Sequence, residues 1–245
     1  MTTISITPDS TEFARRAGNN RLVPITATII ADLDTPLTLF CKIYSDREQV
    51  FLFESMEGGE KWGRYSFIGF DPLVTFSSQG CQVTVGDPAA TSSRSEMVEN
   101  PLASLRELLT EMDAFVDPEL PRFCGGAVGF LGYDIVRFME DLPDSHEHLD
   151  LPDSSFMIPG TILVHDNLRQ TVTVVCWVDT RGKTNLDACY DDAVARLQTV
   201  IGALEAAVPA SVLAKQGNVA ADHQFHSNME PERFQAMVER AKEYI

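Results

Sequence analysis

The apolar positions of the first hundred residues change from helical to strand-like spacing. Thr35-Pro36 supplies a cap and a first-turn proline, and the apolar residues after it recur every three or four positions, which predicts a short helix closed by Asp46. Compact runs rich in strand formers follow at Val50–Phe53 and Tyr65–Phe70, on either side of a Gly-rich connector. Two further runs, Leu73–Ser78 and Cys81–Val85, are also rich in strand-forming residues, and Gln79-Gly80 between them predicts a turn. Strands in such succession predict an antiparallel sheet.

Longer patterns follow in the second hundred residues. Asn100-Pro101 caps a helix whose apolar stripe is built from Leu102, Leu105, Leu108, Leu109 and Met112. Gly125–Gly132 is a glycine-punctuated apolar strand, and the runs Phe156–Val164 and Thr171–Val178 predict another pair of strands. A long helical pattern then covers Asn185–Val208. Because the strands stand in groups with helices between the groups, the predicted fold class is α+β, with antiparallel sheets packed with helices.

The periodicity fades between Pro209 and Ser227, which indicates a linker. Pro231 then begins a second amphipathic helix, with its apolar stripe at Phe234, Met237, Val238, Ala241 and Ile245. No glycine, asparagine or proline stop signal follows this stripe. The residues alone leave two interpretations open: the chain is cut within the first helix of a second domain, or a terminal helix docks back on the core.

The charge of the chain narrows the classes of partner. It has 36 Asp and Glu against 19 Lys and Arg, a formal net charge of −17, which repels polyanions, so we expect no nucleic acid partner.

No segment has the length of apolar sequence that crosses a bilayer, so we expect no membrane partner. The 5 cysteines are scattered without a CxxC pair, as is typical of core residues in a reducing compartment. These features predict a cytoplasmic protein.

The segment Phe53–Ser66 gathers the groups that a free amino acid needs in a binding site. Its carboxylates suit an ammonium group, its cations suit a carboxylate, and its aromatic residues suit an apolar side chain. Side chains alternate along a strand, so Phe51, Phe53 and Ser55 share one face and Glu54 points to the other. A ligand that touches both Glu54 and Ser55 would lie at the end of the strand. Polar residues at a strand end more often form only a solvated turn.

A second polar segment, Glu140–Asp153, crowds carboxylates around His146 and His148. The two histidines are two positions apart, and the segment has neither a calcium-loop nor an H-E-x-x-H pattern. We interpret it as a solvated loop and predict no metal site in it. The chain also lacks a Walker loop, a G-x-G-x-x-G after a strand and a G-x-S-x-G elbow.

Several blocks of sequence resemble one enzyme family in the same order. Residues Glu54–Gly69, which read ESMEGGEKWGRYSFIG, resemble the amino-terminal signature of anthranilate synthase component I. Further blocks agree with that family: Gly125–Asp134, Leu151–Asp153 leading to His165-Asp166, and Ser227–Met229 with the helix after it. The resemblance implies the amino-terminal part of the chorismate-utilising-enzyme fold. It assigns residues 1–208 to a regulatory domain, 209–227 to a linker and 228–245 to the first helix of a truncated chorismate-binding catalytic domain.

The resemblance also implies an activity and an inhibitor site. Members of the family convert chorismate and ammonia into anthranilate and pyruvate with Mg²⁺, and a glutamine amidotransferase subunit, component II, supplies the ammonia. The groups that bind Mg²⁺ and chorismate are expected in the catalytic domain, so no catalytic residue is predicted in this chain. The family's Leu-Glu-Ser motif binds the feedback inhibitor L-tryptophan and matches Glu54 and Ser55, with Phe53 in place of leucine. Arg64, and after it Lys61, are candidates for the tryptophan carboxylate.

Two other functions stay open on the sequence. Aminodeoxychorismate synthase component I, which makes a folate precursor, has a similar architecture, although the amino-acid sequence of Gly58–Gly69 favours anthranilate synthase. A free-standing amino-acid-binding regulatory module without catalysis is consistent with the absence of catalytic residues. Continuation of the coding sequence into a chorismate-binding domain would exclude such a module.

Overall fold

The computed structural model describes residues 4–44, 47–54, 63–142, 150–210 and 226–244. The chain divides into two compact units, Met1–Val212 and Leu213–Ile245. The first unit contains the sheet described below. The second contains the helix α6 (Pro231–Lys242), which begins at a proline as predicted and whose Phe234 and Met237 side chains are exposed.

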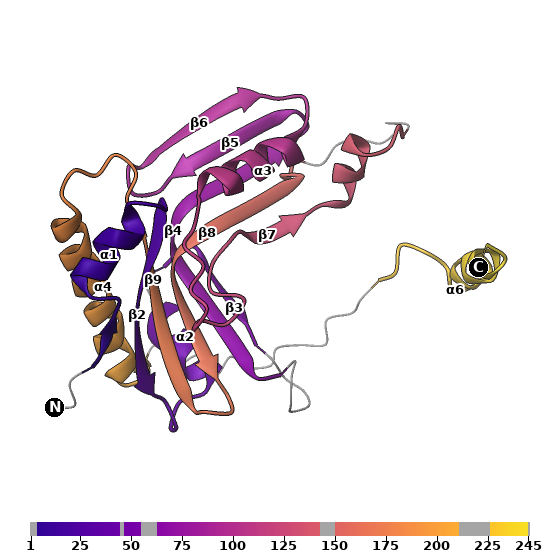
Figure 1. Ribbon diagram of the computed structural model, residues 1–245. Coiled ribbons are helices and arrows are strands. Elements are labelled where there is room, and N and C mark those ends of the chain that lie inside the picture. The colour runs from indigo at the N-terminus through magenta and orange to yellow at the C-terminus, as the bar shows by residue number, and fades with distance from the viewer. Residues whose placement is uncertain (1–3, 45–46, 55–62, 143–149, 211–225, 245) are drawn as a thin grey trace. The chain divides into compact units, whose positions relative to one another are not determined.

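One antiparallel sheet organises the first unit (Figure 1). Its described strands are β1 (Ile6–Thr7), β2 (Leu22–Ile30), β3 (Val50–Phe53), β4 (Tyr65–Gln79), β5 (Gln82–Asp87), β6 (Ser92–Met97), β7 (Val128–Leu131), β8 (Ser154–Asp166) and β9 (Thr171–Asp179). Their order is β1-β2-β9-β8-β4-β5-β6, while β3 pairs with β4 and β7 pairs with β8 beside that path. Every pair of these strands is antiparallel, and the predicted α+β class is confirmed.

Helices cover one face of this sheet (Figure 1): α1 (Ser10–Ala17), α2 (Pro36–Tyr44) and α4 (Leu186–Glu205). Asp9 caps α1 and Asn185 caps α4 through side-chain oxygens that accept backbone N–H bonds. Phe13, Leu39 and Leu197 of the three helices are 0–1% exposed and pack on the strand residues that point to this face. Each such side chain contributes about 1.5–3 kcal/mol through burial, so this layer is the main core of the unit.

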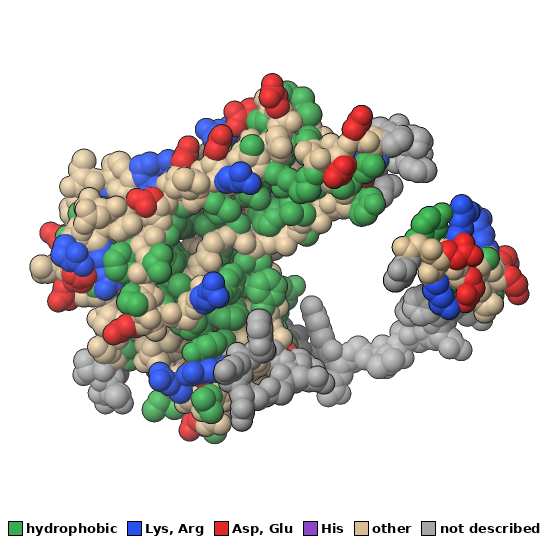
Figure 2. Space-filling model, turned by 45° about the vertical axis from the view of Figure 1, so that its right-hand side comes forward, with side chains coloured by type: hydrophobic (Ala, Val, Ile, Leu, Met, Phe, Trp, Pro, Cys, Tyr) green, Lys and Arg blue, Asp and Glu red, His purple; other side chains and the backbone are tan. Residues whose placement is uncertain are grey.

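The opposite face of the sheet carries a smaller core and stays partly open. The helix α3 (Pro101–Glu111), capped by Asn100, and the loop after it contribute Leu108, Met112 and Leu120 to a cluster that contains Trp177. Hydrophobic residues elsewhere on the unit remain exposed, among them Phe53, Phe130, Leu131 and Tyr133. Figure 2 shows hydrophobic side chains gathered on the side of this unit that is turned to the viewer.

β4 is longer than the sequence predicts, and it positions the candidate site. The sequence predicts two strands, Tyr65–Phe70 and Leu73–Ser78, whereas the structure has a single strand that ends at Gln79. Asp71 takes a φ of 49°, and the register with β8 shifts between Pro72 and Val74. β8 pairs with β4 on both sides of this bulge, so the strand bends without ending. Its first half lies beside β3 and its second half beside β5.

The other predicted elements agree with the structure in type but differ in extent. The helices predicted after Thr35, Asn100 and Asn185 are confirmed, although α4 ends at Glu205 and Asp46 lies outside the described residues. The strand predicted over Gly125–Gly132 shrinks to β7, and a short 3-10 helix, Tyr133–Phe138, follows it. Of the described helices, none is long and apolar enough to cross a membrane. The division at 209–227 stays a prediction, because most of that segment is outside the described residues.

Candidate functional site

A group of aromatic rings lies where β3 ends and β4 begins. The antiparallel register sets Phe53 opposite Phe67 and Phe51 opposite Gly69. The ring centroids of Phe51 and Phe53 are 4.9 Å apart, which confirms that these two side chains share a face. Gly69 has no side chain, and the Phe51 ring fills the space over it, where an added Cβ would overlap the ring. The end of β3 therefore presents aromatic surface on one side.

Phe123 joins this group from a distant part of the sequence. Its ring meets Phe67 edge-on, with centroids 4.9 Å apart and an interplanar angle of 89°, and its centroid is 6.2 Å from that of Phe53. Tyr65 adds a ring 6.3 Å from Phe67. Tilted and edge-on rings at these separations attract one another. These five residues, Phe51, Phe53, Tyr65, Phe67 and Phe123, are called the aromatic cluster below.

The residues predicted to bind an inhibitor are only partly described by the structure. Phe53 is 49% exposed, so its ring contributes to the aromatic cluster and also faces solvent. Glu54 follows it and is exposed at the end of β3. Ser55 and Lys61 lie outside the described residues. The structure thus brings an exposed ring and an exposed carboxylate to the same strand end.

Arg64 is already engaged by a carboxylate. Its Nε atom lies 3.0 Å from both carboxylate oxygens of Asp166, and its Nη2 atom donates to one of them. Its guanidinium also lies 4.9 Å from the centre of the Tyr65 ring. An arginine held in this way has fewer free donors for a ligand. The geometry therefore supports a role for Arg64 in fixing the start of β4 more than a role in taking up an inhibitor carboxylate.

The surroundings of Asp166 favour its charged form. Burial by itself raises the pKa of a carboxyl group, but hydrogen bonds from Arg64 and from the backbone N–H groups of Arg169 and Leu168 outweigh it and hold the pKa of Asp166 below its ordinary value. The hydrogen bond to Asp166 is also the main reason that the pKa of Arg64 is raised. The pair is therefore ionised throughout the neutral range.

Two of the cavities in the surface of the unit lie beside β3 and beside the loop after α3. A cavity of about 310 Å³ is lined by Val50 and Phe51 of β3 and by Phe130 of β7, among others. Another, of about 490 Å³, is lined by the loop after α3 and by Trp177 and Ile158 of the sheet. Both volumes fall in the range of roughly 300–1,000 Å³ that is typical of small-molecule pockets. The second cavity adjoins the segment that carries Phe123.

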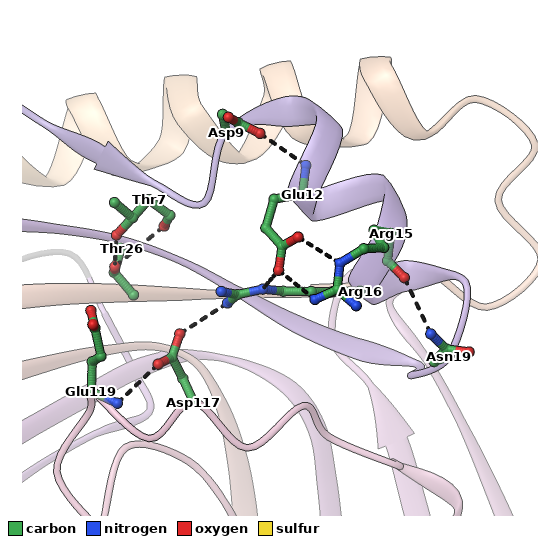
Figure 3. Close-up of polar contacts among 9 residues, drawn as sticks. All are labelled: Thr7, Asp9, Glu12, Arg15, Arg16, Asn19, Thr26, Asp117 and Glu119. Atoms are coloured by element: carbon green, nitrogen blue, oxygen red, sulfur yellow. Dashed lines mark hydrogen bonds and ion pairs between the residues drawn. The ribbon is translucent and has the colours of Figure 1, made fainter.

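The loop that leads to Phe123 is tied to α1 (Figure 3). Arg16 of that helix donates to Asp117 at 2.9 Å, and its guanidinium lies 4.2 Å from the centre of the Phe115 ring. Both side chains of the Arg16–Asp117 pair are 16% exposed. Glu12 binds Arg16 from the other side at 2.8 Å, which orients the guanidinium. The first half of the loop is thus fixed by a partly buried ion pair.

The described residues offer no metal site. No group of three or more His, Cys, Asp or Glu side chains among them is arranged to hold a metal ion. Half of the polar segment Glu140–Asp153, including both of its histidines, is outside the described residues, and Asp153 accepts a hydrogen bond from the backbone N–H of Gly80. The Mg²⁺ implied by the family resemblance therefore finds no ligand set in this part of the chain, and no chemical step is assigned to it.

Comparison with known proteins places the chain in a family. The model of the chorismate binding enzyme family matches residues 48–245, which is most of the chain. The chain belongs to the chorismate binding enzyme family. The matched region includes β3, the whole aromatic cluster and Trp177. The candidate site therefore lies within the part of the chain that the chorismate binding enzyme model covers.

Curated relatives and a solved structure agree with this assignment. Anthranilate synthase component 1 of Cereibacter sphaeroides is 34% identical over 240 residues, which are 97% of this chain and 47% of that protein. The same component of Acetivibrio thermocellus is 34% identical over 194 residues, 79% of this chain and 38% of that protein. The crystal structure of anthranilate synthase component I from Streptococcus pneumoniae TIGR4 has the same fold, with a TM-score of 0.54 and 20% identity over 89% of this chain and 45% of that one. The chain spans less than half the length of these relatives.

These findings confirm the resemblance to anthranilate synthase component I as well as the fold class. The sequence missed the contribution of Phe123, because its loop carries no periodic signal that links it to β3 or β4. Gly125 follows in the same loop and has no side chain, which allows another group to approach its backbone closely. Trp177 is the group that approaches Gly125.

Proposed function

We propose that this chain is the amino-terminal, tryptophan-sensing part of an anthranilate synthase component I. The complete enzyme would convert chorismate and ammonia into anthranilate and pyruvate with Mg²⁺, and component II, a glutamine amidotransferase, would supply the ammonia. The observation that carries the proposal is the 34% identity to an anthranilate synthase component 1 over 97% of the chain. Chorismate and Mg²⁺ would bind in the catalytic part of that enzyme, outside this chain.

The proposed L-tryptophan site lies at the end of β3. The aromatic cluster supplies apolar surface for the indole ring, with the exposed face of Phe53 as its outer part. Glu54 supplies an exposed carboxylate for the ammonium group, and Ser55 follows directly in the sequence. Arg64 is a less favourable partner for the carboxylate of tryptophan, because it would have to be shared with Asp166.

Inhibition at this site would be allosteric, since tryptophan and chorismate would occupy different parts of the enzyme. A coupling free energy of about 1–3 kcal/mol between two sites changes the apparent affinity of the substrate by roughly 5- to 150-fold. The exposed hydrophobic surface of the sheet unit supports an arrangement in which the regulatory part contacts the catalytic part.

The complete protein, expressed with the remainder of its coding sequence, tests this proposal. Chorismate, ammonium and Mg²⁺ are supplied, and the fluorescence of anthranilate is followed with and without L-tryptophan. We expect anthranilate to form and tryptophan to suppress it. Formation of aminodeoxychorismate instead of anthranilate would contradict the proposed enzyme. Anthranilate formation that tryptophan leaves unchanged would contradict only the proposed sensing of tryptophan.

A further inference from the structure

Trp177 of β9 holds the segment of chain that carries Phe123. Its indole Nε1–H donates a hydrogen bond to the carbonyl oxygen of Cys124 at 2.7 Å. The Trp177 residue is 5% exposed, so water has little access to its side of this bond. Separating such a donor and acceptor is costly, because each is left without a partner. The peptide group that directly follows Phe123 is therefore fixed to the sheet.

Gly125 makes a second contact with the same ring. A Cβ added to Gly125 would lie 2.8 Å from Cζ2 and 3.0 Å from Nε1 of Trp177, which is closer than ordinary packing allows. Only a glycine therefore lets the backbone lie against the indole at this distance. Gly126 follows with a φ of 108°, a conformation that favours glycine, and the chain then enters β7. One tryptophan ring thus sets two consecutive residues after Phe123.

The position of Phe123 depends on its loop, because the residue belongs to neither α3 nor β7. Upstream, the loop is anchored by the pair Arg16–Asp117. Downstream, the anchor is the adjacent bond between Trp177 and Cys124. The nearer anchor has more control over where the Phe123 ring meets Phe67 and Phe53.

We propose that Trp177 is a positioning residue for the inhibitor site. It holds the Phe123 ring against Phe53 and Phe67, and so shapes the apolar surface that receives the indole ring of tryptophan. Trp177 does not touch the inhibitor and acts only through Phe123. This inference rests on the proposed function, because it names a residue that supports the same site.

The test uses the complete enzyme carrying Trp177→Phe, which keeps an aromatic ring but removes the N–H donor. The tryptophan concentration that halves anthranilate formation is measured, together with kcat and the KM for chorismate in the absence of tryptophan. We expect the half-inhibiting concentration to rise by about five- to ten-fold, the scale of one lost hydrogen bond. The kcat and KM should stay within about two-fold of the parent, since chorismate binds elsewhere.

Gly125→Ala is an independent second variant, because it leaves the indole donor in place and pushes the backbone away from the ring. It should weaken tryptophan inhibition in the same direction. Gly202→Ala is the matched control: Gly202 lies in α4, and a Cβ there meets nothing within 4 Å. Inhibition of the control should equal that of the parent.

A double variant separates positioning from general support of the fold. If Trp177 acts through Phe123, then Trp177→Phe should have little further effect on inhibition once Phe123→Leu has removed the ring. Parent-like inhibition of both Trp177→Phe and Gly125→Ala would overturn the inference. A fall in kcat that matches the loss of inhibition would overturn it too, because Trp177 would then only support the fold. A parent enzyme that forms anthranilate but is not inhibited by tryptophan would instead refute the proposed sensing of tryptophan, on which this inference rests.

Discussion

The guanidinium of Arg64 and the carboxylate of Asp166 form a two-pronged ion pair at the start of β4. Asp166 ends β8, and one of its oxygens also accepts the backbone N–H groups of Leu168 and Arg169 in the turn toward β9. A single carboxylate therefore fixes both the start of β4 and the turn between β8 and β9. Because Tyr65 follows Arg64 directly, the pair also sets where the aromatic cluster begins.

Asp166→Asn should lower the stability of the sheet unit at neutral pH. Asparagine keeps an oxygen for the turn but removes the charge that holds Arg64. The native pKa of Asp166 is lowered, so its stabilisation is present above the unfolded value of 3.8 and is lost as the pH falls through the lower native value. Urea unfolding midpoints of parent and variant, measured from about pH 7 downward, should therefore converge only below about pH 4.

The control for this experiment is Asp192→Asn, which changes an exposed carboxylate on α4. Its unfolding midpoint should stay close to that of the parent at every pH. A difference between parent and Asp166→Asn that is as large in acid as at neutral pH would show that the charge of Asp166 is not the source of the stabilisation.

Gly69→Ala should destabilise the sheet unit by about 1–3 kcal/mol, because the new methyl group overlaps the Phe51 ring in a packed layer. Urea unfolding measures the change, and Gly202→Ala on α4 serves again as the matched glycine control. An unchanged unfolding midpoint for Gly69→Ala would mean that Phe51 moves aside without cost. The aromatic cluster would then not be a packed group.

Arg16 and Asp117 should be energetically coupled. A double-mutant cycle with Arg16→Gln and Asp117→Asn is expected to give a coupling on the order of 1 kcal/mol in unfolding free energy, because both side chains are 16% exposed. The same cycle on Arg181 and Glu111, which are 62% and 64% exposed, should give a coupling close to zero. Additive effects in the first cycle would mean that α1 does not fix the loop.

The sequence predicts the helices α2, α3, α4 and α6, because their signals are local, whereas α1 (Ser10–Ala17) was not predicted. Thr35-Pro36 and Asn185 stand at helix starts, and the apolar stripes after them recur at helical spacing. The sequence does not predict β6 (Ser92–Met97). All of its residues are exposed and all but Met97 are polar, so the strand lacks the alternation of apolar and polar residues that marks a half-buried strand. The sequence predicts two strands in place of β4, because the pair Asp71-Pro72 is typical of a turn. In the structure Asp71 has a positive φ and the strand has a bulge there, but it does not end.

The candidate site, like the fold, was only partly predictable from the sequence. The shared face of Phe51 and Phe53 follows from strand alternation and was predictable. The ion pair between Arg64 and Asp166 and the contact of Phe123 with Phe67 join residues that are far apart in the chain. The periodicity of the sequence does not predict such contacts. The same holds for Trp177, whose contact with Gly125 arises only when β9 and the loop after α3 meet.

The end of β3 is the proposed site at which tryptophan inhibits the complete enzyme. Ser55→Phe tests this proposal, because the substitution adds a phenyl ring at the proposed tryptophan site and removes a hydroxyl group at once. Glu54→Ala removes the proposed partner of the ammonium group and is measured alongside. Ser93→Phe, at an exposed position on β6, is the matched control for adding a ring elsewhere on the sheet.

The measurement is anthranilate formation against tryptophan concentration for the parent, Ser55→Phe and the Ser93→Phe control. The half-inhibiting tryptophan concentration of Ser55→Phe should rise on the order of 100-fold or more, with kcat and the KM for chorismate within a few-fold of the parent. The control should be inhibited like the parent. Inhibition of Ser55→Phe at the parent's tryptophan concentration would contradict the claim and remove the end of β3 from the inhibitor site.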